Sequence, residues 1–195
     1  MSALLAEKGA AIIDFDAIVH EVQAPGGRAY QGIVDRFGPD VVLPDGSLDR
    51  AKLASIVFNN PEARTDLNRL TYPALGAVVA ERMNELSKTD RVVVLDIPLL
   101  AEGSRKQYQM AGVIVVDIDP EVAVERLVGQ RGMDEDDARR RQAAQASRDQ
   151  RLTIADHIID NSGTIEELRA RVDAAWAWVE TLRPAQAAAE KASEE

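Results

Sequence analysis

The chain has 195 residues, of which 46% are hydrophobic, and carries a formal net charge of −10 at pH 7. This length suits one domain, and the acidic charge weighs against nucleic acid as the main partner, because binding a phosphate backbone needs clustered cations. The chain contains no cysteine, which excludes a disulfide framework, a thiolate zinc site and a thiol nucleophile.

Hydropathy predicts no membrane partner. No apolar run approaches the ~18 residues of a membrane span. The segment 1–11 is short and carries both Glu7 and Lys8, so no secretory signal is expected there. We therefore expect a cytoplasmic protein.

The first predicted elements are the end of a helix and a short strand. Residues 3–8 have helical propensity and Gly9 stands where a C′ glycine belongs, as at the end of a helix whose beginning is missing. Residues 11–13 form a predicted buried strand that runs into Asp14 and Asp16. On an extended segment, residues i and i+2 point the same way, so both carboxylates would face one cleft and one would serve as a base. The alternative is that they cap a helix starting near residue 17, which the pattern alone favours.

A helical insertion is predicted next, over residues 17–87, with breaks at 24–27 and 43–46. Residues 91–95 and 112–118 are then continuous apolar runs, which are typical of a parallel sheet covered on both faces. Asp96 ends the first run, at the sheet edge where open α/β sheets bind ligands. The commoner use of such an aspartate is as a turn former, and the pattern alone leaves both open.

Seven arginines crowd the following stretch of this acidic chain. We predict a helix over 120–128, a break at Gly132 and a charged helix over 134–146. Clustered arginines favour a small phosphorylated ligand, whereas the alternative is a solvated helix face with ion pairs to neighbouring carboxylates, at about even odds. The arginines are Arg126, Arg131, Arg139, Arg140, Arg141, Arg148 and Arg151.

The last predicted elements are a strand at 158–159 and a helix that a capping box opens at residues 164–167. Trp176 falls on the apolar face of this helix and is predicted to pack in the core. His20 and His157 lack the spacing of a metal site or a catalytic triad, so we expect ordinary packing roles. Residues 185–195 are an Ala/Glu/Lys/Ser tail that is predicted to be disordered.

Taken in chain order, several segments resemble the dephospho-coenzyme A kinase family, which acts in the last step of coenzyme A synthesis. The resemblance extends over roughly residues 3–180, and its Leu-Asp-Ile-Pro-Leu-Leu and Asp-Asn-Ser-Gly segments are specific in combination. The matching segments are Ile13–Ile18 with His20-Glu21, Phe37-Gly38, Asp45–Arg50, Val57-Phe58, Val94–Leu100 with Glu102, Arg126-Leu127, Gln145, Ala155-Asp156 and Ile159–Gly163.

The resemblance implies an α/β fold with a three-layer parallel sheet of the P-loop kinase type, a helical substrate-binding insertion and a helical lid. Residues 1–23, 89–130 and 152–184 would form the core nucleotide-kinase domain. Residues 24–88 would form the helical coenzyme A-binding domain and residues 131–151 the lid.

The implied reaction is the ATP-dependent phosphorylation of the ribose 3′-hydroxyl of dephospho-coenzyme A (dephospho-CoA), with Mg²⁺. Asp16 would be the catalytic base, and Asp96 would hold Mg²⁺ through water. Arg140, Arg141 and Asn161 would contact ATP. The residues expected to bind the substrate are Asp14, Arg50, Tyr72, Pro73 and Glu102.

The sequence departs from the family at the phosphate-binding loop. No Gly-x-x-x-x-Gly-Lys-[Ser/Thr] occurs in it, and no lysine follows a glycine. The loop supplies backbone N–H groups and a lysine to the phosphates, so little or no kinase activity is expected of this polypeptide. Tyr72 also replaces the family's usual histidine, and Ala101 an aromatic residue.

Three hypotheses follow. The favoured one is a dephospho-CoA kinase whose first strand and loop are missing because the start site was misassigned or the chain truncated. The second is a non-catalytic relic that binds coenzyme A or serves as an interaction module. The third is a kinase of the same fold with a different small-molecule substrate, which the Leu-Asp-Ile-Pro-Leu-Leu segment disfavours.

Overall fold

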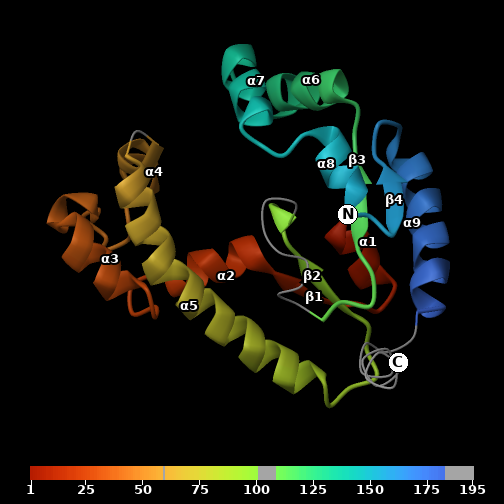
Figure 1. Ribbon diagram of the computed structural model, residues 1–195, viewed down its shortest axis with the longest axis horizontal. Coiled ribbons are helices and arrows are strands. Elements are labelled where there is room, and N and C mark those ends of the chain that lie inside the picture. Colours follow the sequence, from red (N-terminus) through yellow and green to blue (C-terminus); the bar gives the residue numbers. More distant parts are fainter. Residues whose placement is uncertain (59, 101–108, 183–195) are drawn as a thin grey trace. The chain divides into compact units, whose positions relative to one another are not determined.

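The computed structural model describes residues 1–58, 60–100 and 109–182 (Figure 1). The described residues divide into two compact units, one made of those in the range 9–98 and the other of residues 1–8 with the described residues from 99 onward. The first unit contains β1 (Ala11–Asp14), α2 (Phe15–Val22), α3 (Tyr30–Phe37), the 3₁₀ helix η1 (Pro39–Val41), α4 (Arg50–Phe58), α5 (Pro61–Leu86) and β2 (Val93–Asp96). The second contains α1 (Ser2–Glu7), β3 (Ile114–Asp117), α6 (Pro120–Arg131), α7 (Glu135–Ala143), α8 (Arg148–Thr153), β4 (His157–Asp160) and α9 (Ile165–Glu180).

Unit 9–98 is built on a pair of parallel strands. β1 pairs with β2 from Ala11 beside Val93 to Asp14 beside Asp96, so both strands end in register at an aspartate. The guanidinium of Arg91 donates to the carbonyl oxygens of residues 9 and 10, at 3.1 and 2.8 Å. These bonds tie the residues just before β1 to those just before β2, so the two strands start side by side.

The helical part of this unit packs around α5. Helices α2, α3 and α4 each contact α5, and ion pairs link Arg28 to Glu81 and Arg36 to Asp66 across these contacts. The packing is apolar at its centre because the helices turn their aliphatic residues toward one another. The fully or nearly fully buried side chains are Ile18, Val22, Ile33, Val41, Leu53, Val78 and Val79.

The second unit is built on another parallel pair, β3 beside β4, which ends in register at Asp117 and Asp160. Helix α9 packs on β4 and also contacts α1. The contact with α1 is reinforced by ion pairs from Lys8 to Asp173, at 2.5 Å, and from Arg169 to Glu7, at 2.9 Å. The residues at both ends of the described chain therefore belong to one packed unit.

The α/β class with parallel strands, predicted from the two apolar runs, is confirmed. The capping box at Thr164–Glu167 is present as predicted. His157 stacks on the indole of Trp178 with ring centroids 5.0 Å apart, as expected for a packing residue. Trp176 is half-buried and donates to Glu180.

One helix prediction is wrong. The charged helix expected over 134–146 ends at Ala143, and a separate helix, α8, starts at Arg148. A second capping box, in which Ser147 and Gln150 exchange side-chain and backbone hydrogen bonds, starts this additional helix. The division into core, insertion and lid domains stays a prediction. No helix among the described residues is both long enough and apolar enough to cross a membrane.

Candidate active site

The predicted catalytic carboxylates lie at the strand ends of unit 9–98. Asp14 and Asp96 are register partners at the carboxyl ends of β1 and β2. Neighbouring strands are ~4.8 Å apart, so the two backbones bring these carboxylates side by side. Asp16 follows in the first turn of α2 and is exposed to solvent. The unit thus presents three acidic side chains at one strand edge and the helix that leaves it.

Asp14 also caps α2, because its Oδ1 accepts from the backbone N–H of Ala17 at 2.9 Å. The expectation that Asp14 and Asp16 extend from one extended segment is wrong. The helix already begins at Phe15, whose ring is buried, so Asp16 sits on the first helical turn. The sequence offered two alternatives for Asp14, a helix cap or a site residue at the strand edge. The two roles are compatible, because capping engages only one of the two carboxylate oxygens.

Magnesium fits this edge by the chemistry of its donors. Carboxylate oxygens are the ligands that Mg²⁺ prefers, and it commonly binds proteins through one or two carboxylates plus water and phosphate. No group of three or more histidine, cysteine or acidic residues that would enclose a metal occurs among the described residues. The predicted role of Asp96, through water, needs no such group.

The predicted substrate residues Arg50, Tyr72 and Pro73 lie in the helical part of the same unit. Arg50 is the first residue of α4 and donates through Nη1 to the side-chain oxygen of Gln23 at 3.0 Å. Tyr72 and Pro73 lie inside α5, and Tyr72 is 60% exposed. Glu102 lies outside the described residues.

The predicted ATP residues lie in the second unit. Arg140 and Arg141 are exposed on α7. The guanidinium of Arg140 is paired with Asp137, whose hydrogen bond and charge raise the pKa of Arg140. Asn161 follows β4 directly, and its backbone N–H donates to the carbonyl oxygen of Asp117 at 2.7 Å.

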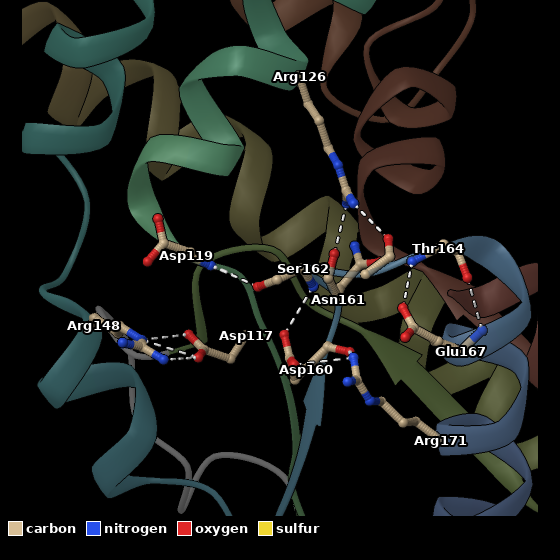
Figure 2. A network of polar contacts seen from close by, with 11 residues as sticks. Asp117, Asp119, Arg126, Arg148, Asp160, Asn161, Ser162, Thr164, Glu167 and Arg171 are labelled. Atoms are coloured by element: carbon tan, nitrogen blue, oxygen red, sulfur yellow. Dashed lines mark hydrogen bonds and ion pairs between the residues drawn. The ribbon is translucent and has the colours of Figure 1, made fainter.

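The loop around Asn161 is held by two arginines that the sequence did not single out for this role (Figure 2). Arg126 on α6 donates to the carbonyl oxygens of Asn161 and Gly163, at 2.6 and 2.9 Å. Arg171 on α9 donates to the carbonyl oxygen of Asp160 at 2.5 Å and forms an ion pair with its carboxylate. We call residues 160–163 the Asn161 loop. Its shape is fixed from both flanking helices.

An ion pair between a buried aspartate and an exposed arginine lies beside this loop. Asp117, only 5% exposed at the end of β3, accepts from Nε and Nη2 of Arg148 at the start of α8. The hydrogen bonds and charge of Asp117 raise the pKa of Arg148. The ion-pair interpretation of the arginine cluster has members, since Arg139 and Arg140 pair with nearby carboxylates on the helix surface, whereas binding of a phosphorylated ligand stays a prediction.

Ser162 lowers the pKa of Asp160, the aspartate at the end of β4. Hydrogen bonds from the side chain and backbone of Ser162, with smaller contributions from Arg171 and Arg148, lower the pKa of Asp160 below its ordinary value of 3.8. Because the folded pKa lies below the unfolded one, this stabilisation is present above pH 3.8 and is lost as the pH falls through the folded pKa.

We expect Ser162→Ala to raise the pKa of Asp160 toward 3.8. Titration of the carboxyl carbons by NMR measures the change. Asp45, whose pKa is lowered by Ser47 in the other unit, serves as the internal reference and should not move. An unchanged Asp160 titration in the variant would contradict the assignment of Ser162 as the main cause.

Comparisons with known proteins agree on one family. The sequence model of dephospho-CoA kinase matches residues 1–167. A dephospho-CoA kinase of Streptomyces avermitilis is 49% identical over 178 residues, covering 91% of this chain and 85% of the relative. That of Thermobifida fusca is 47% identical over 173 residues, covering 88% and 85%.

Two solved structures have a similar fold. The Thermus thermophilus protein TT1252 superposes with a TM-score of 0.74 at 28% identity, covering 90% of this chain and 88% of that one. A dephospho-CoA kinase from Campylobacter jejuni superposes with a TM-score of 0.65 at 25% identity, covering 91% and 88%.

Proposed function

This chain belongs to the dephospho-CoA kinase family, and from that membership we propose that it carries the base, the Mg²⁺ residue and the substrate contacts for ATP-dependent phosphorylation of the ribose 3′-hydroxyl of dephospho-CoA. The observation that best supports the proposal is the register of β1 and β2, which brings Asp14 beside Asp96 with Asp16 on the next helical turn. Two carboxylates at a parallel strand edge and a third just beyond it suit a reaction that removes a proton beside bound phosphates.

Asp16 is the proposed base. Its carboxylate is exposed on the first turn of α2 and lies near the strand edge where open α/β sheets bind ligands. There it would accept the proton of the attacking 3′-hydroxyl. Asp14, held by its capping bond to Ala17, would orient the ribose.

Asp96 is the proposed residue for Mg²⁺, which when bound neutralises charge on the transferred phosphate. Arg140, Arg141 and Asn161 are the proposed ATP contacts. Arg50, Tyr72, Pro73 and Glu102 are the proposed contacts to dephospho-CoA. Of these, Arg50 carries the charge that suits the diphosphate of that substrate.

A second candidate function follows from the missing phosphate-binding motif. Without that motif, these 195 residues would bind dephospho-CoA but not transfer phosphate. The helical part of unit 9–98, with its own buried core, supports binding as a separate property.

We expect the purified 195-residue chain to bind dephospho-CoA and to release ADP from ATP at no more than the background rate. Isothermal titration with dephospho-CoA measures the first property. A coupled ADP-release assay with ATP, Mg²⁺ and dephospho-CoA measures the second, with Asp16→Asn as the control.

Release of ADP that depends on dephospho-CoA and disappears in Asp16→Asn would establish the kinase and contradict the expected inactivity. A chain that binds no dephospho-CoA would contradict both candidate functions. The mass of the N-terminal peptide of the protein from its native cells then decides whether a Gly-x-x-x-x-Gly-Lys-[Ser/Thr] segment precedes Met1.

A further inference from the structure

A buried polar contact joins α2 to α5 in unit 9–98. Gln23, at the C-terminal end of α2, is 7% exposed, and Thr71, in the middle of α5, is 4% exposed. Nε2 of Gln23 donates to Oγ1 of Thr71 at 3.1 Å. An apolar pair would fill a helix–helix contact without the cost of burying polar atoms, so this polar pair calls for an explanation.

The third member of the contact is Arg50, the first residue of α4. Its Nη1 donates to Oε1 of Gln23 at 3.0 Å, from the exposed side of the pair. A glutamine amide has a donating NH₂ group and an accepting oxygen on opposite sides. Because the hydroxyl of Thr71 accepts from the NH₂ group, the oxygen is turned toward Arg50.

This arrangement holds Arg50 without cancelling its charge. A glutamate at position 23 would also accept from the guanidinium, but it would neutralise it. The neutral amide engages one of the five N–H donors of the guanidinium and leaves the full positive charge for an anion. A fixed guanidinium also loses less side-chain entropy when it binds.

We propose that Gln23 and Thr71 are positioning residues that hold Arg50 ready for the diphosphate of dephospho-CoA. The proposal rests on the proposed function, in which Arg50 contacts that substrate. Neither Gln23 nor Thr71 needs to touch the substrate, since both act through the guanidinium.

The test is a double-mutant cycle on dephospho-CoA binding, measured by isothermal titration. Thr71→Val has nearly the same shape as threonine but removes the hydroxyl, and we expect it to weaken binding about fivefold, the effect of one hydrogen bond. Thr71→Ser keeps the hydroxyl and should restore the native affinity. In an Arg50→Ala background, Thr71→Val should change the affinity no further, because the residue through which it acts is gone.

Thr65→Val is the matched control, since Thr65 lies on the same helix and donates to the carbonyl oxygen of Pro61 on the exposed side. It should bind like the unaltered chain. Gln23→Glu is a second variant, which keeps the shape of the side chain and an acceptor for Arg50. It should weaken binding of dephospho-CoA because its negative charge offsets that of the guanidinium. The affinity should then also depend less on salt concentration.

The outcomes separate the two claims. An unaltered chain that binds no dephospho-CoA overturns the proposed function, and the positioning role with it. If the unaltered chain binds dephospho-CoA but Thr71→Val leaves its affinity unchanged, the positioning role alone is overturned. The same holds if Thr71→Val weakens binding equally with and without Arg50. If Thr71→Val does not fold, native affinity in Gln23→Glu overturns that role instead.

Discussion

Replacing Arg126 with methionine is expected to lower the free energy of unfolding of its unit by about 3 kcal/mol, from the loss of two hydrogen bonds with a charged donor. The guanidinium donates to the carbonyl oxygens of Asn161 and Gly163 (Figure 2). Methionine keeps the length of the side chain but offers no donor, so both half-buried carbonyls lose this partner. The backbone of the Asn161 loop then loses its attachment to α6.

Urea denaturation measures the total effect, and hydrogen exchange of the amides of residues 161–163 locates it. Arg131→Met is the matched control on the same helix, where Arg131 is exposed, and should change stability by less than ~0.5 kcal/mol. Arg126→Lys should recover only part of the loss, because an ammonium group lacks the fixed fork that reaches two carbonyls. Unchanged exchange in Arg126→Met would show that the loop holds its shape without this side chain.

Replacing Gly27 with alanine is expected to destabilise unit 9–98 by about 3 kcal/mol, at the upper end of the usual cost of overpacking. A Cβ at this position would lie 2.5 Å from each of the carbonyl oxygens of Glu21 and Val22, in the last turn of α2. These are backbone atoms, so no side chain can turn away to make room. Relief would require the turn after α2 to move, and with it Gln23.

Gly76→Ala is the control, and it is expected to stabilise the unit where Gly27→Ala destabilises it. Gly76 lies inside α5 with no atom within 4 Å of an added Cβ, so alanine should stabilise the helix by roughly 0.5–1 kcal/mol. Thermal unfolding of both variants beside the unaltered chain makes the comparison. Equal melting temperatures for Gly27→Ala and the unaltered chain would contradict the close contact between residue 27 and the last turn of α2.

The elements that the sequence predicted well are those with a local signal. The apolar runs predicted over residues 91–95 and 112–118 contain the strands β2 and β3, and the capping box at residue 164 opened a helix. Helix α8 was missed although its start has a local signal too, since Ser147 and Gln150 match the spacing of a capping box. The start of α2 was placed late because Phe15 is apolar enough to extend a strand.

The contacts that orient the candidate site could not be predicted in this way. Gln23 and Thr71 are 48 residues apart, and Arg126 reaches a carbonyl 35 residues away. No periodicity or motif pairs such positions, because only the packing of the helices brings them together. The roles of Asp14, Asp16 and Asp96 came from a family resemblance, to which the structure adds the register of Asp14 beside Asp96 and the place of Asp16 in the first turn of α2.

The ion pairs that fasten α1 to α9 bear on the order in which the protein folds during synthesis. Glu7 and Arg169 are 162 residues apart, so α1 has its packing partner far along the chain, in α9. Residues 9–98 have their own strand pair and buried core and are complete once β2 has left the ribosome. We therefore expect residues 9–98 to fold before the other unit, and residues 1–8 to reach their native packing only after α9 has been made.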